Sequence, residues 1–137
     1  MLVTREVYYN GGVNTETYDD GVSGLTCVTL YRDEKAGVFV YKDIPMKLTD
    51  GARADLTALY FSVVLNQAIP DETVMAQWQE RGYPVLPITA GDLRADGHKF
   101  SEHRQKCFTA AGTVKANLQN YTTAEQIKAA FDTAYNA

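Results

Sequence analysis

The first third of the chain has the hydrophobic pattern of β-strands. Residues 3–10 (VTREVYYN) alternate, while residues 25–31 (LTCVTLY) and 37–44 (GVFVYKDI) are rich in β-branched and aromatic residues. A polar loop, residues 14–24, follows the first run, and the short charged link Arg32 to Ala36 joins the other two. Pro45 ends the third run because it cannot donate a ladder hydrogen bond. The pattern predicts a three-stranded antiparallel meander.

A helical period follows this β-rich part. Thr49-Asp50 supplies a cap, and the helix is expected to run to about Ile69, before Pro70. Its apolar residues form one broad face, which predicts a central helix packed on the sheet. The residues of that face are Leu56, Leu59, Tyr60, Val63 and Val64, widened by Phe61 and Leu65.

The remaining chain reads as helices with one further strand. Residues 71–81 suit a short helix anchored by Trp78, and residues 83–89 suit a fourth strand that Pro84 and Pro87 confine to a sheet edge. Ser101 can cap a third helix, and Thr122 with Glu125 has the spacing of a capping box for a terminal one. The fold class expected is α/β (α+β), with three to four helices in a single domain over residues 1–137.

Composition narrows the class of protein. Hydrophobic residues make up 45% and charged residues 22%, as in ordinary globular chains. The net charge of −4, with no run of basic residues, argues against nonspecific nucleic-acid and membrane partners. The first residues lack a basic stretch followed by an apolar one, and no apolar run approaches the length of a membrane span, so we expect a cytoplasmic protein, in the host cytoplasm if it is viral. Cys27 and Cys107 are predicted to be free buried thiols rather than a disulfide.

Two local stretches resemble motifs of the ribonuclease H-like family. Residues 7–12 (VYYNGG) are similar to the family's first strand, which ends in an acidic residue and glycine, with Asn10 at the acidic position. Residues 51–59 (GARADLTAL) are similar to its first-helix signature, with Asp55 at the acidic position. The resemblance covers mainly residues 3–70 and implies the order of elements of that fold.

The resemblance also implies a site. In that family, carboxylates hold two divalent metals for phosphodiester cleavage, so a nuclease would use Mg²⁺ with Asp55, Asp92 and Asp96, and draw on Asp19 and Asp20. Asn10 is neutral, however, which removes one anionic ligand. This difference from the family's motif favours a degenerate, noncatalytic member of the ribonuclease H-like family that needs no cofactor.

Other residues suggest binding rather than catalysis. Tyrosines on a sheet face can stack on bases or anchor a protein partner, and local basic residues can hold phosphate. The ligand-binding candidates are Asn10, Tyr8, Tyr9, Tyr31, Tyr41, Arg94 and Arg104. His103 and Cys107, four residues apart and near His98, have the spacing of zinc ligands on a helix but lack a fourth ligand. No resident metal is therefore expected.

Three functions remain open at this point. The first is a small noncatalytic binding protein on a degenerate ribonuclease H-like scaffold, of the kind that phages and mobile elements use to inhibit or sequester a host protein or a nucleotide signal. The second is a metal-dependent nuclease of the ribonuclease H-like class. The third is a structural protein that forms a homo-oligomer through an exposed sheet edge.

Overall fold

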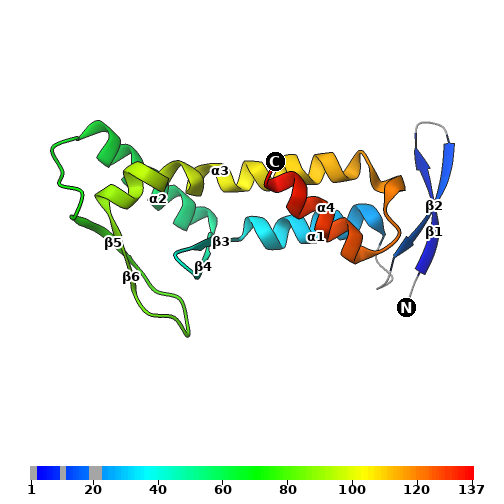
Figure 1. Cartoon of the computed structure of the whole chain (residues 1–137), viewed down its shortest axis with the longest axis horizontal. Helices are drawn as coiled ribbons and strands as arrows, with labels where there is room; N and C mark the ends of the chain where they lie inside the picture. The colour runs from blue at the N-terminus through cyan, green and yellow to red at the C-terminus, as the bar shows by residue number, and fades with distance from the viewer. Residues whose placement is uncertain (1–2, 10–11, 19–22) are drawn as a thin grey trace. The chain divides into compact units, whose positions relative to one another are not determined.

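The computed structural model describes residues 3–9, 12–18 and 23–137 and shows a mixed α and β chain (Figure 1). The general α+β class is therefore confirmed. In chain order the elements are β1 (Val3–Tyr9), β2 (Gly12–Tyr18), α1 (Gly24–Ala36), β3 (Val38–Tyr41), β4 (Ile44–Lys47), α2 (Asp50–Leu65), β5 (Val74–Trp78), β6 (Leu86–Thr89), α3 (Ala90–Lys115), a 3₁₀ turn (Leu118–Asn120) and α4 (Ala124–Tyr135).

The described strands form three separate two-stranded antiparallel sheets, β1–β2, β3–β4 and β5–β6. The first extends from the pair Val3 and Tyr18 to the pair Tyr9 and Gly12, so the polar residues 14–18, predicted as loop, form a strand. Each sheet joins strands that are consecutive in the chain. The predicted three-stranded meander is therefore wrong for the part of the chain that the structure describes.

The second predicted strand, residues 25–31, is part of helix α1. Ser23 begins this helix, since its Oγ accepts a hydrogen bond of 3.2 Å from the N–H of Thr26. Cys27, Val28 and Tyr31 are buried, a spacing that suits one face of a helix. Burial of these side chains on one face of a helix outweighs the strand propensity of this run, because strand propensity depends strongly on tertiary context.

The third predicted strand is a hairpin, β3–β4. Lys42 and Asp43 have φ values of 49° and 65°, the left-handed conformation that a two-residue hairpin turn requires at both positions. Pro45, predicted to end a strand, instead lies inside β4 opposite Val40. A proline is tolerated there because both strands of a two-stranded sheet are edges.

Helix α2 begins as predicted. The Oγ1 of Thr49 accepts a hydrogen bond of 3.1 Å from the N–H of Ala52, and the helix ends at Leu65, four residues before the predicted end. Residues 71–81, predicted as a helix, contain strand β5, which pairs with the correctly predicted strand at β6. Pairing with β6, the next strand in the chain, outweighs the weak helical signal of so short a segment.

The last two helices differ from prediction in where they begin. Helix α3 starts at Ala90, before Ser101, because Thr89 and Asp92 cap it reciprocally: the N–H of each donates to the side chain of the other, at 3.0 and 3.1 Å. The cap of α4 is Thr123, whose Oγ1 accepts from the N–H of Gln126 at 3.1 Å. The predicted box at Thr122 is therefore shifted by one residue.

The chain divides into two compact units, residues 1–35 with 105–137 (unit 1) and residues 36–104 (unit 2), so one boundary falls inside α3. The single-domain expectation stays a prediction, because this division does not measure whether either unit folds alone. None of the helices in the described residues is long and apolar enough to span a membrane.

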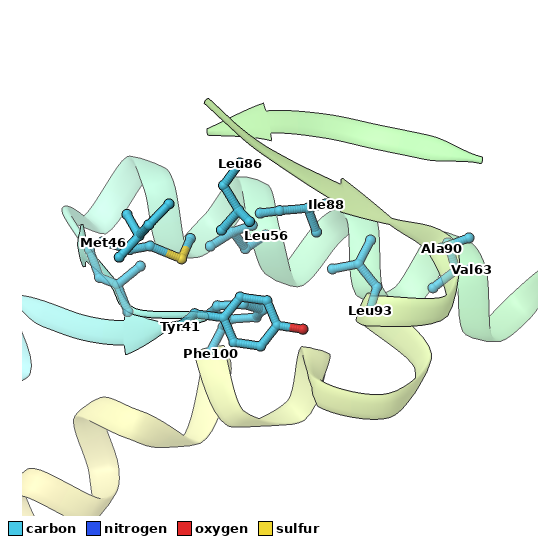
Figure 2. Packing of buried hydrophobic residues seen from close by; sticks show 11 residues of the cluster. Tyr41, Met46, Leu56, Val63, Leu86, Ile88, Ala90, Leu93 and Phe100 are labelled. Atoms are coloured by element: carbon cyan, nitrogen blue, oxygen red, sulfur yellow. The ribbon is translucent and has the colours of Figure 1, made fainter. Parts of the chain in front are cut away.

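Each unit has buried apolar residues of its own. In unit 2 the side chains of the two hairpins, α2 and the start of α3 converge, as Figure 2 shows. That cluster comprises Tyr41, Ile44, Met46, Leu48, Leu56, Val63, Leu86, Ile88, Ala90, Leu93 and Phe100. In unit 1 the buried residues of α1, α3 and α4 include Val28, Tyr31, Cys107, Val114, Ile127 and Phe131, and the rings of Tyr31 and Phe131 meet edge to face at 5.0 Å.

Candidate functional site

Two of the three nominated catalytic carboxylates lie one turn apart on α3, and both hold the fold together. Asp92 accepts from the N–H of Thr89 and, at 2.9 Å, from the Nζ of Lys42. Burial opposes ionisation of Asp92, but the hydrogen bonds from Lys42 and Thr89 outweigh it and lower its pKa below the usual range. Asp92 is therefore held in its charged form, in which it caps α3 and pairs with Lys42.

Asp96 has equally defined neighbours. Its two oxygens accept from Lys99 Nζ at 2.9 Å and from the Tyr41 hydroxyl at 2.8 Å. These hydrogen bonds lower the pKa of Asp96 despite partial burial. The third carboxylate, Asp55, is exposed on α2. Within residues 3–9, 12–18 and 23–137, no group of three or more His, Cys, Asp or Glu side chains is placed to hold a metal ion.

Two of the tyrosines nominated for binding, Tyr31 and Tyr41, are buried rather than exposed on a sheet face. Tyr31 lies on helix α1 and is buried, and its hydroxyl donates to Asp132 at 2.9 Å. Tyr41 lies on β3 and is buried in the core of unit 2. Burial is the largest cause that raises the pKa of both phenols. Tyr8 and Tyr9 are in β1, opposite Val13 and Gly12.

Three nominated residues lie outside the described part of the chain: Asn10, Asp19 and Asp20. Arg94, nominated for phosphate, is engaged at the end of α2. Its guanidinium donates to the carbonyl oxygens of Val63 and Asn66, at 3.4 and 3.1 Å, and pairs with Asp71. It therefore caps a helix terminus. Arg104 is exposed on α3.

The residues with zinc-ligand spacing are also structural. His103 is buried, with its Nε2 2.8 Å from the carbonyl oxygen of Val38 and its ring 5.1 Å from that of Phe39. Cys107 is buried in unit 1, and burial raises the pKa of its thiol to about 11. A thiol that stays protonated at neutral pH is a poor nucleophile and a poor metal ligand.

An apolar surface on α2 is the feature that sequence reasoning missed. Phe61 and Leu65, assigned to the core face, are 55% and 84% exposed, whereas Leu56 and Val63 are buried. The exposed residues recur at helical spacing, on the side of the helix away from the core. We call this set the α2 outer face: Ala54, Ala58, Phe61 and Leu65, with Val64 at its edge.

The α2 outer face adjoins a shallow hollow of about 490 Å³. The hollow is lined by Asp50, Arg53, Ala54, Thr57, Ala58 and Phe61 of α2 and by Ser101 of α3. Arg53 pairs with Asp50, one turn earlier, at one end of this surface. Ala54, Ala58 and Phe61 all line this hollow, and Leu65 follows Phe61 one turn later, so the surface combines a recess with two large exposed apolar side chains.

The sequence held a signal for this surface. Residues 56–70 contain no charged residue, and apolar residues occur on both sides of the helix. A helix that is apolar all round is normally covered on all sides. No protein-family model matches the chain, and neither a curated protein nor a solved structure matches it. The site must therefore be interpreted from its own geometry.

Proposed function

We propose that this chain is a small noncatalytic binding protein that contacts a protein partner through the α2 outer face. The observation that carries the proposal is the exposure of Phe61 and Leu65 on the side of α2 opposite its buried residues. Large apolar side chains gathered on one exposed strip are typical of protein interaction surfaces. The recess beside them offers a socket for an apolar side chain of the partner.

The chemistry of the surface favours a protein over a nucleotide. A phosphate group needs a free cation or a cluster of N–H donors, but the guanidinium of Arg53 at this surface is paired with Asp50. The rest of the hollow is lined by alanine, threonine, phenylalanine and serine, and the α2 outer face adds the exposed Leu65. Such a surface suits an amphipathic helix, which docks through apolar residues at similar spacing.

The nuclease alternative has less support from the residues nominated for it. Asp92 is committed to the cap of α3 and to Lys42, and Asp96 to Tyr41 and Lys99. A metal would have to displace these donors. The resemblance to the ribonuclease H-like family stays a prediction, since Asn10 lies outside the described residues. A phage origin and a nucleotide signal as ligand likewise stay predictions.

One experiment tests the proposed surface directly. The dye 1-anilinonaphthalene-8-sulfonate fluoresces on accessible apolar surfaces, and its signal is compared for the wild type in dilute solution and for the double variant Phe61→Ser with Leu65→Ser. We expect the signal to fall in the double variant. The matched control is Leu30→Ser on α1, because Leu30 is 58% exposed but lies in unit 1. Equal signals in all three proteins would contradict the proposal.

A second experiment separates binding from catalysis. Thermal melting is followed while Mg²⁺ or Mn²⁺ is added, since a bound metal raises the melting temperature by mass action. The proposal expects no rise. A rise that Asp55→Asn abolishes would favour the nuclease alternative.

A further inference from the structure

We propose that the partner of the α2 outer face is a second copy of this chain, with the two α2 helices packed antiparallel about a two-fold axis. The inference rests on the proposed function, because it uses the same surface and names its occupant. Two features point to it: the order of small and large residues along the face, and the position of the charges on the helix.

The α2 outer face is complementary to itself when it is reversed. Along the helix it reads small, small, large, large, as Ala54, Ala58, Phe61 and Leu65, and the members of each pair are four positions apart. A two-fold axis between residues 59 and 60 therefore sets Ala54 opposite Leu65 and Ala58 opposite Phe61. A two-fold interface uses the same patch on both copies, which requires this kind of match.

The recess fits the side chains that this arrangement brings to it. Ala54, Ala58 and Phe61 line the hollow, and the side chains of Phe61 and Leu65 are 55% and 84% exposed. In the antiparallel pair, Leu65 of the second copy enters beside Ala54, and Phe61 of the second copy covers Ala58. Small residues opposite large ones let two helices approach to about 8 Å while they fill the space between them.

The charges of α2 select the antiparallel direction. Its charged residues, Asp50, Arg53 and Asp55, all lie in its first six residues. Parallel packing would bring each of these charges beside its own copy, and like charges in contact repel. Antiparallel packing brings them beside the uncharged last turn of the second copy.

The size of the surface predicts a weak dimer. A strip along one helix is smaller than the roughly 800 Å² per partner of standard stable interfaces. We therefore expect an equilibrium between monomer and dimer that depends on protein concentration.

Sedimentation velocity over a range of concentrations tests the dimer. The weight-average mass of the wild type is expected to rise with concentration, and Leu65→Lys is expected to raise the dissociation constant at least about tenfold. Leu65 is 84% exposed, so this variant should fold, and circular dichroism checks it. The control is Leu30→Lys, an exposed leucine of unit 1, which should dimerise like the wild type.

A charge pair tests the orientation. Ala54→Glu and Leu65→Lys should each weaken the dimer, but the double variant should dimerise more tightly than either, because residue 54 of one copy meets residue 65 of the other. Within one copy these residues lie three turns apart, too far to pair with each other. A double variant no tighter than the single variants would overturn the antiparallel arrangement.

The two proposals can fail separately. A wild type that is monomeric at every concentration, or a Leu65→Lys variant with unchanged association, overturns the self-association. If the dye signal in the monomer still depends on Phe61 and Leu65, the α2 outer face binds a different protein and the proposed function stands. If the dye signal is also independent of these residues, both proposals are wrong.

Discussion

The hydroxyl of Tyr41 on β3 donates a 2.8 Å hydrogen bond to Asp96 on α3, 55 residues later in the chain. The ring of Tyr41 packs edge to face on Phe100 in the core of unit 2 (Figure 2), with ring centroids 5.1 Å apart. The same side chain therefore contacts both the core and the carboxylate of Asp96. Lys99 holds the other oxygen of Asp96. The hydrogen bond between Tyr41 and Asp96 ties the β3–β4 hairpin to α3.

The variant Tyr41→Phe removes the hydroxyl and keeps the ring. We expect the free energy of unfolding to fall by about 1 kcal/mol, because one hydrogen bond to a partly exposed carboxylate is lost. Urea denaturation measures the change. Tyr121→Phe is the control, since Tyr121 is a partly buried tyrosine in unit 1. Equal stability of wild type and Tyr41→Phe would mean that this hydrogen bond contributes nothing.

The stability of unit 2 should decrease at low pH. The pKa values of Asp92 and Asp96 are lowered in the folded state. Their stabilisation is therefore complete above the pKa of an unfolded aspartate, about 4, and is lost as the pH falls through the folded values. Melting temperatures from pH 6 down to about 2 should decrease, and the decrease should be smaller in Lys42→Met, which removes a hydrogen bond that lowers the pKa of Asp92. An equal decrease of melting temperature with falling pH in wild type and Lys42→Met would contradict this role of Asp92 and Lys42.

Two glycines on α3 should respond in opposite directions to alanine. A Cβ on Gly97 would lie 2.4 Å from Cδ2 and 2.9 Å from Cγ of Tyr60, so α2 and α3 would have to separate. We expect Gly97→Ala to lower the free energy of unfolding by about 1–3 kcal/mol. A Cβ on Gly112 meets nothing within 4 Å, and Gly112→Ala should add up to about 1 kcal/mol. Denaturant titration of both variants checks the contrast.

Arg94 should stabilise the end of α2. Arg94→Ala leaves the carbonyl groups of Val63 and Asn66 without the guanidinium, and we expect a loss of about 1–2 kcal/mol. Arg81→Ala, at an exposed position beyond β5, should change stability by less than about 0.5 kcal/mol. Hydrogen exchange can locate the effect, because the last turn of α2 should exchange faster in Arg94→Ala. Unchanged exchange there would argue against a capping role.

Cys107 should resist alkylation in the folded protein. Burial raises the pKa of its thiol to about 11, so the reactive thiolate is scarce and inaccessible at pH 8. We expect iodoacetamide to modify Cys107 only after denaturation, as peptide mass spectrometry would show. Rapid modification of the native protein would mean that α3 opens readily at this point.

The local sequence determined those elements whose signals lie within a few residues. Thr49 caps α2 because a threonine oxygen reaches the N–H three residues on, and this interaction needs nothing from the rest of the chain. The first strand, β6 with its edge prolines and the last helix were likewise predicted from their own residues. The hydrogen bonds of Asp92 to Thr89 and Lys42 and of Asp96 to Tyr41 were not predicted, because most of these partners lie elsewhere in the chain.

Tertiary structure decided what depends on partners outside the segment itself. Leu25–Tyr31 has strand propensity but forms a helix, and Val74–Trp78 forms a strand because β6 pairs with it. The two faces of α2 are both apolar, so no local pattern distinguishes the buried Val63 from the exposed Leu65. Which face is covered depends on where the hairpins and α3 pack. The burial of a side chain depends on how the whole chain packs, whereas a helix cap depends on only about four consecutive residues.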